Sequence, residues 1–272
     1  MSRSRRQEMG DFLRSRRSRL TPKAVGLPAN ARRRSPGLRR EDVAQLAGIG
    51  VDWYVRLEQG RAVNPSMTTI DSLAKALRLG KVEHAHLRAL ASSPDRRPFV
   101  SEMVSPTLRR VVESLNQPAY VTGRRWDVLA WNEAADKIFG FSRLEAGERN
   151  TLVTMLTKPH ARRLFGAQWA NEARRMIAQF RATHDLWSGE AAFIELLERL
   201  RAGCPEFEGW WEAHDIGKPQ SGRKQLSRQE SIVSFEYATF QANDDPDLKL
   251  VIYAPAARAD VGCNEAIEKA QM

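Results

Sequence analysis

The sequence predicts two domains of different class: an all-α domain of five helices, followed by an α+β domain with an antiparallel sheet. Three observations lead to this prediction. The N-terminal third contains only helical patterns, the apolar residues take strand-like spacing from Pro118 on, and a Pro- and Ser-rich segment separates the two parts. We place the domains, the linker and the tail at residues 1–92, 93–106, 107–256 and 257–272, in the order first domain, linker, second domain and C-terminal tail.

Charge is distributed unevenly between these parts. Residues 1–100 contain 21 Lys and Arg against 9 Asp and Glu, a net charge of +12. Residues 101–272 contain 22 against 24, a net charge of −2. A basic third joined to a near-neutral remainder is typical of a polyanion-binding module attached to a second domain. A merely solvated basic face is the alternative.

The composition argues against several other classes of protein. No apolar run reaches the roughly 18 residues that span a bilayer, and the Arg-rich start lacks the apolar part of a secretion signal. We therefore expect a cytoplasmic protein with no membrane contact. The sequence has no GxSxG, GxxxxGK or HExxH motif and no dinucleotide-binding glycine pattern, so we expect no enzyme and no catalytic residues.

The cysteines and histidines do not predict a metal site. Cys204 and Cys263 are too few for a disulfide framework and too far apart for a closely spaced zinc site. The five histidines are dispersed along the chain. The dipeptide Cys204–Pro205 resembles one found in some haem-regulated proteins, but a cysteine before a helix-starting proline is common.

Helical periodicity predicts the five helices of the first domain near residues 8–20, 40–47, 51–59, 66–78 and 82–91. Only "GIG" separates the second helix from the third. Gly48 can take the left-handed conformation that ends a helix, Ile49 can fill the turn, and Ala44 is small where the helices would cross. This ordered combination indicates a helix-turn-helix pair.

The apolar residues of this pair leave one face of the third helix free. Val43 and Ala47 lie one turn apart on the second helix, and Tyr54 and Leu57 do so on the third, so these four should share a core. The opposite face then presents Val51, Asp52, Val55, Arg56 and Gln59. A short helix with a polar face at its exposed N-terminal end fits a DNA major groove. An ordinary helical hairpin would show a similar core pattern.

The second domain has a different order of elements. "PAYVTGRRWDVLAW" predicts two short strands around a Gly-Arg turn, and a helix capped by Asn132 and closed by Gly140 follows. Further helices extend to about residue 214. The three last strands are expected near 223–229, 231–241 and 248–254. Two strands, helices and three antiparallel strands is the order of a PAS-like sensor fold.

The sequence resembles a known family in both domains. "LRREDVAQLAG…RLEQGR…NPS" is similar to the helix-turn-helix domain of Xre/Cro-type repressors. The longer "GLRREDVAQLAGIGVDWYVRLEQGRAVNPS", with "RNTLVTMLTKPHARRLF", "CPEFEGWWEAHDI" and "LKLVIYAP", resembles MmyB-like transcriptional regulators over nearly the whole chain. The resemblance implies a sequence-specific DNA-binding transcription regulator. Because one helix-turn-helix covers only a few base pairs, we expect a homodimer on a double-stranded DNA operator with an inverted repeat.

The resemblance also implies which residues contact DNA. They are Arg40, Gly50, Val51, Asp52, Trp53, Arg56, Gln59, Arg61, Asn64 and Ser66. It places base-reading side chains at Val51, Asp52 and Arg56, and phosphate contacts at Arg40, Gln59 and Ser66. Arg can fork onto guanine and Asp can accept from a cytosine amino group. The phage repressors have paired glutamines where this chain has Val51 and Asp52, and Asp52 can alternatively be a charge favoured by the helix dipole.

Two further expectations concern the first domain. By resemblance, Arg17 and Glu58 match a buried ion pair that links the first and third helices. The segment between the first and second helices, residues 21–40, is longer than in the phage repressors and contains five arginines. It is expected to be an exposed loop that touches the DNA backbone or a minor groove, or else a solvated loop.

The resemblance implies that the second domain holds a fatty-acid-like or other apolar molecule between its sheet and helices. The predicted ligand-binding residues are Tyr120, Leu129, Trp131, Phe139, Leu152, Leu156, Phe165, Met176, Phe180, Tyr237 and Tyr253. Such apolar stripes also form packed cores without a cavity. In that alternative the domain is purely a dimerisation or protein-interaction module. Apart from a bound fatty acid or similar ligand, we expect no cofactor and no metal.

Overall fold

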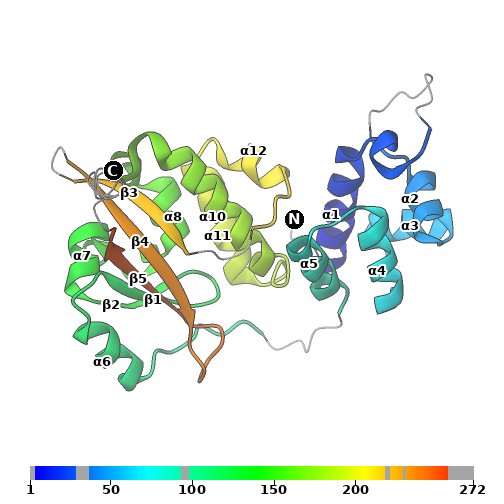
Figure 1. The fold of residues 1–272 in the computed structure, drawn as a ribbon. Helices are drawn as coiled ribbons and strands as arrows, with labels where there is room; N and C mark the ends of the chain where they lie inside the picture. The colour runs from blue at the N-terminus through cyan, green and yellow to red at the C-terminus, as the bar shows by residue number, and fades with distance from the viewer. Residues whose placement is uncertain (1–3, 29–36, 93–97, 218–220, 229–230, 257–272) are drawn as a thin grey trace, which may run out of the picture.

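The computed structural model describes residues 4–28, 37–92, 98–217, 221–228 and 231–256 (Figure 1). The predicted fold class is confirmed. The described chain is helical up to residue 91, and a domain with helices and a five-stranded antiparallel sheet follows.

The first domain consists of helices whose positions agree closely with the sequence periodicity. They are α1 (Arg5–Arg19), α2 (Arg40–Ala47), α3 (Val51–Glu58), α4 (Met67–Ala76) and α5 (Lys81–Ala91), with the short 3-10 helix η1 (Pro22–Val25) after α1. The predicted core positions Val43, Ala47, Tyr54 and Leu57 are all buried, and Phe12 of α1 lies in the same apolar cluster. Burying these side chains in one cluster is the main stabilisation of such short helices.

The second domain begins with α6 (Pro106–Ser114), whose first turn is capped by the Ser105 side chain. The remaining elements are β1 (Ala119–Thr122), β2 (Val128–Trp131), α7 (Glu133–Phe139), η2 (Phe141–Arg143), η3 (Ala146–Glu148), α8 (Thr151–Thr157), α9 (Pro159–Phe165), η4 (Gly166–Gln168), α10 (Trp169–His184), α11 (Ala191–Gly203), α12 (Phe207–Glu212), β3 (Gly222–Arg228), β4 (Ser231–Gln241) and β5 (Lys249–Pro255). Asn132 caps α7 and Gly140 ends it in a left-handed conformation, as the sequence predicts.

The sheet has the strand order β2-β1-β5-β4-β3, with every neighbouring pair antiparallel. The last strand in sequence therefore lies in the middle, between β1 and β4. Tyr120, Tyr237 and Tyr253 cluster on one face of the sheet. On the other face, Val121 and Ala130 pack with Val112 of α6. Because side chains alternate along a strand, this register decides which residues lie on the face with the tyrosines and which lie on the face that packs against α6.

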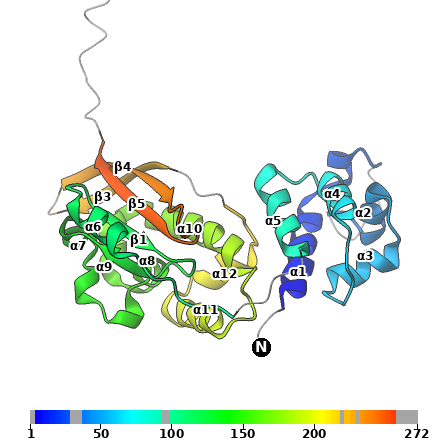
Figure 2. The same cartoon turned by 90° about the horizontal axis from the view of Figure 1, so that it is seen from below.

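Figures 1 and 2 both show α10, α11 and α12 between the sheet and the helices of the first domain. Contacts between the two domains come from α1 and α5 on one side. On the other side they come from the end of α10 and the segment after α12. The helix α10 therefore extends from the sheet side of the second domain to the first domain.

Candidate nucleic-acid interface and ligand cavity

The turn between α2 and α3 has the geometry that its glycine predicts. Gly48 has a φ of 67°, and its N–H donates to Gln45 O at 3.2 Å. The next N–H, from Ile49, donates to Ala44 O at 3.0 Å. A left-handed residue with these two bonds ends α2 and turns the chain directly into α3. The two helices are thus held in a fixed helix-turn-helix arrangement.

A buried carboxylate ties three helices of this domain together. Glu58 is 1% exposed and accepts from Arg17 Nε at 2.8 Å and Nη2 at 3.0 Å. The expected Arg17–Glu58 ion pair is therefore confirmed. Arg40 Nε adds a third bond, at 2.9 Å. Burial raises the pKa of Glu58, but the bonds and charges of Arg17 and Arg40 outweigh burial and hold this pKa below its usual value.

The outward side of α3 carries the predicted DNA-binding side chains. Eight of the ten predicted residues are exposed, namely Gly50, Val51, Asp52, Arg56, Gln59, Arg61, Asn64 and Ser66. Trp53 is half-buried against the domain core, and Arg40 is half-buried because its guanidinium also holds Glu58. In the part of the chain that the structure describes, no carboxylate pairs with Arg56. Its guanidinium is free to meet a base edge.

The N-terminus of α4 can also bind an anion. Ser66 Oγ accepts from Thr69 N at 3.1 Å and so caps the helix. The first turn of a helix has further N–H groups without partners inside the helix, and a phosphate is favoured there. Within the predicted loop 21–40, residues 29–36 lie outside the described residues, including three of its five arginines.

Two adjoining cavities lie between the sheet and helices α8–α10 of the second domain. Their shared wall consists of Tyr120, Thr151, Met176, Lys224 and Tyr253. The first cavity is further lined by polar groups and by Trp126, Tyr237 and Val251. The second is lined mainly by apolar side chains, among them Phe139, Phe141, Leu164 and Phe165. A molecule that occupies both would meet a polar end and an apolar end.

The first cavity is cationic. Lys224, Arg175 and Lys249 all line it. Lys224 Nζ lies 3.3 Å from Tyr253 Oη and 3.7 Å from Glu172. Arg175 bonds Glu172 and Tyr237 Oη. Burial lowers the pKa of Lys249, and no carboxylate of the described residues pairs with it. Three cations therefore face one carboxylate, and the cavity favours an anionic group.

The predicted ligand-binding residues divide into two groups in the structure. Six line the cavities, namely Tyr120, Phe139, Phe165, Met176, Tyr237 and Tyr253. Leu152, Leu156 and Phe180 lie in the packed helical core. Leu129 packs with α6 on the far face of the sheet, and Trp131 packs on Phe141 beneath Arg149. Helical spacing finds an apolar face but does not show which of its residues border a void.

Sequence reasoning missed the cationic residues and Thr151. In β3, Lys224 and Leu226 are both buried while Arg223 and Gln225 are exposed. The signal in the sequence was the spacing of two residues between Lys224 and the apolar Leu226, because alternate residues of a strand share a face. Lys249 has the same spacing from Val251 and Tyr253 in β5, whereas Arg175 of α10, between Arg174 and Met176, gave no such signal.

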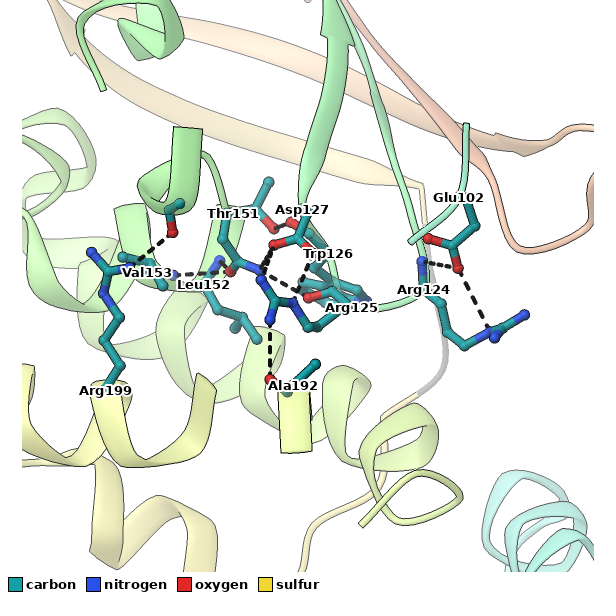
Figure 3. Close-up of polar contacts among 12 residues, drawn as sticks. Glu102, Arg124, Arg125, Trp126, Asp127, Thr151, Leu152, Val153, Ala192 and Arg199 are labelled. Atoms are coloured by element: carbon teal, nitrogen blue, oxygen red, sulfur yellow. Dashed lines mark hydrogen bonds and ion pairs between the residues drawn. The ribbon is translucent and has the colours of Figure 1, made fainter. Parts of the chain in front are cut away.

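Figure 3 shows the contacts of the turn between β1 and β2, and two of the residues drawn there, Trp126 and Thr151, line the first cavity. Trp126 has a φ of 68°, which is uncommon for a bulky residue. Its carbonyl accepts from Thr151 N at 3.0 Å. Beside it, Arg125 forms two bonds with Asp127 and one with Ala192 O of α11. These contacts hold both Trp126 and Thr151 at the cavity.

Two further groups bear on metal or cofactor binding. Glu8, His184 and Asp185 have ligand atoms within 4.8 Å of one another. However, the Arg181 guanidinium lies 3.7 Å from Glu8 and 3.6 Å from Asp185 and already supplies a cation there. Cys204 is buried and donates to Glu206, and burial, with the adjacent Glu206 carboxylate, raises the pKa of its thiol. A neutral thiol is a poor metal ligand.

Comparison with known proteins gives matches in both domains. Residues 104–261 match the model of the MmyB-like transcription regulator ligand binding domain. Residues 8–87 match the model of a helix-turn-helix domain. No curated protein matches the chain. Among the described residues, no helix is long and apolar enough to cross a membrane.

Proposed function

Because the chain belongs to the family of MmyB-like transcription regulators, we propose that its ligand is an elongated apolar molecule with an anionic end, such as a fatty acid. The family assignment makes the chain a DNA-binding regulator with a ligand-binding domain. The observation that supports the ligand class is the pair of adjoining cavities. One contains Lys224, Arg175 and Lys249, and the other is lined by aromatic and aliphatic side chains.

The anionic end would lie in the cationic cavity. A charge-assisted hydrogen bond to Lys224 or Lys249 is about twice as strong as a neutral one. The apolar chain would extend past Tyr120 and Met176 toward Phe165. Burial of each methylene group contributes about 0.8 kcal/mol, so the affinity should rise with chain length until the second cavity is full.

We test this proposal with two matched series, straight-chain carboxylic acids and the corresponding primary alcohols. Isothermal titration of the full-length protein should show a length optimum in both series and tighter binding of each acid than of its alcohol. Met176→Trp, which narrows the shared wall, should weaken binding, whereas Met103→Trp at an exposed position should not. Equal binding of acids and alcohols would contradict an anionic ligand, and no binding in either series would contradict the ligand class.

We further propose that α3 reads base sequence and that the protein acts as a homodimer on an inverted repeat. Arg56 supports the first part, because its exposed guanidinium can fork onto guanine. Two half-sites about one helical turn apart, roughly 34 Å, would then match the two-fold axis of the dimer. Selection of preferred duplexes from a random pool, followed by sedimentation of the protein on the selected DNA, tests both statements. A monomer on a single half-site would contradict the dimer.

A second candidate function for the C-terminal domain is a protein interface without a ligand. It is favoured by apolar side chains at the surface, namely Val111 of α6 and Ile232 and Phe240 of β4. Native mass spectrometry of freshly purified protein distinguishes the two functions, since it reports bound ligand mass and oligomeric state together. A dimer with no bound molecule and no response to the acid series would favour this second function.

A further inference from the structure

Seven ionisable residues are buried where the two domains meet. The first domain contributes Glu8 and Arg16 of α1 and His86 of α5. The second domain contributes Arg181 and His184 at the end of α10, Asp185 directly after α10, and His214 after α12. None of the seven is more than 9% exposed. We call them the interdomain cluster.

Direct contacts across the boundary hold this cluster together. Arg181 Nη1 lies 3.7 Å from Glu8 Oε2. His86 Nε2 lies 3.2 Å from Asp185 Oδ2, and Arg16 Nη2 donates to His214 O at 2.6 Å. Within the second domain, Arg181 also lies 3.6 Å from Asp185 and stacks on Trp211. Each domain thus supplies partners for buried charges of the other.

Such contacts are sensitive to position. A buried charge that loses its partner keeps its desolvation penalty, so a small separation of the two sides is costly. Apolar contacts tolerate sliding better because they are not directional. Among the described residues, the apolar side chains of the second domain that pack against the first-domain core are Leu186 and Ile216, and both are half-buried. The cluster therefore favours one relative position of the domains.

The same helix carries both the cavity and the cluster. Arg175, Met176 and Gln179 of α10 line the first cavity. Arg181 and His184 follow on the same uninterrupted helix, and Asp185 caps its end. A shift of α10 that makes room for a ligand must therefore also move the groups that face Glu8 and His86.

Within the first domain, α1 packs closely against α3, the helix proposed above to read the base sequence. A Cβ on Gly10 of α1 would lie 2.4 Å from Glu58 O of α3, so the two backbones are in direct contact. About two turns further along α1, Arg17 holds the Glu58 side chain. A displacement of α1 is consequently passed to α3 rather than absorbed between them.

We propose that the interdomain cluster is the contact through which an occupied cavity alters the position of α3, and so the affinity for DNA. The order of contacts is cavity, α10, Arg181 and Asp185, then Glu8 and His86, then α1 and α3. This inference rests on the ligand binding proposed above. A ligand changes DNA affinity only by as much as it prefers one domain arrangement over the other, and the cluster defines one such arrangement.

The test uses full-length protein and two variants on the first-domain side of the boundary. Glu8→Gln removes a charge that faces Arg181, and His86→Gln removes the imidazole that faces Asp185. Arg181→Met is a third variant at the centre of the cluster. Arg201→Gln is the matched control, because its ion pair with Glu208 lies within the second domain and is exposed. Tetradecanoic acid is the probe. Its binding is measured by titration, and operator affinity is measured with and without it on a duplex selected by the wild-type protein.

In the wild-type and control proteins the acid should change operator affinity by about 5- to 150-fold, the usual range for allosteric coupling. Glu8→Gln and His86→Gln should bind the acid within about 3-fold of wild type, yet show a coupling reduced to about 3-fold or less. If these variants keep the full coupling, the route through the cluster is overturned while the ligand proposal stands. If the acid does not bind the wild-type protein, the ligand proposal fails and the coupling route fails with it.

A second measurement does not depend on any ligand or on DNA. Spin labels at two exposed positions, Gln45→Cys of α2 and Arg110→Cys of α6, report the interdomain distance in a Cys263→Ser background. The distribution should be narrow in the unmodified cluster and broad in Glu8→Gln and His86→Gln. An unchanged distribution in both variants would show that the cluster does not hold the domains and would overturn the inference.

Discussion

In the first domain the candidate binding residues lie outside the core, whereas in the second the cavity lies within it. Arg56, Gln59 and Asp52 project from a helix whose other side is closed by Tyr54 and Leu57. In the second domain Tyr120, Lys224 and Tyr253 are buried and line the cavities themselves. Mutations of binding residues should therefore leave the stability of the first domain nearly unchanged, but they should perturb packing in the second domain.

The largest expected effect concerns Glu58, the buried carboxylate that ties α1, α2 and α3 together. Glu58→Ala leaves Arg17 half-buried without its partner, and breaking a buried pair in this way costs on the order of 3–5 kcal/mol. Hydrogen exchange should show lower protection in α1–α5 and unchanged protection in the sheet. The control is Glu41→Ala, an exposed glutamate of α2, which should cost less than about 1 kcal/mol. Equal loss in both domains would show that they unfold together.

The same carboxylate predicts how the stability of the first domain depends on pH. Its folded-state pKa is lower than its unfolded value, so the folded state binds fewer protons. The stabilisation is therefore complete above the ordinary glutamate pKa of about 4.3 and is lost as the pH falls through the lower folded value. Urea unfolding of wild type and Glu58→Gln across this acidic range should show a steeper loss in wild type. Parallel curves would contradict the role of this group.

The next effect concerns the cationic cavity. Lys224→Met removes a buried ammonium but keeps an apolar side chain of similar length. It should weaken binding of tetradecanoic acid by on the order of 10- to 100-fold, because hydrogen bonds to charged groups contribute about 1.5–3 kcal/mol. Binding of the corresponding alcohol should change little. Lys137→Met, on the exposed surface of α7, serves as the control and should bind both as wild type does.

A somewhat smaller effect, on DNA affinity, is expected for the exposed residues of the first domain. Arg56→Ala should cost about 1–3 kcal/mol on the selected duplex and less on random DNA, because a base contact is lost. Arg40→Ala should weaken binding to both duplexes similarly and flatten the salt dependence. Since Arg40 also holds Glu58, this variant should lose some stability as well. Equal losses on both duplexes for Arg56→Ala would contradict base reading.

The smallest effect concerns the turn between α2 and α3. Gly48 has a φ of 67° and open space around the position of a Cβ, so Gly48→Ala is opposed only by backbone strain. That strain is about 1–2 kcal/mol for a residue with a side chain. Gly50 has equally open space but a φ of −67°, so Gly50→Ala introduces no left-handed strain and should cost less than Gly48→Ala. Thermal unfolding of the two variants checks the difference.

The sequence by itself determined the elements of the first domain. The positions of α2 and α3 and the left-handed Gly48 follow from contacts within a few residues of each other. The shared core of Val43 and Leu57 follows from the one-turn spacing of apolar residues on each helix and from the short turn between the helices. Backbone sterics and one-turn spacing govern such contacts, and both can be read along the chain. The Arg17–Glu58 pair lies further apart in sequence and was found because the family resemblance supplied it.

Only the tertiary structure decided the cavity and the boundary between the domains. Strand periodicity indicates β5 but not its place between β1 and β4, which brings Tyr253 beside Tyr120. Arg175, Lys224 and Lys249 come from three separate elements, and nothing in the local sequence of any one of them predicts the other two. Local sequence specifies which face of an element is apolar, but a void and a buried charge pair both depend on how distant elements pack, because each is defined by what lies opposite.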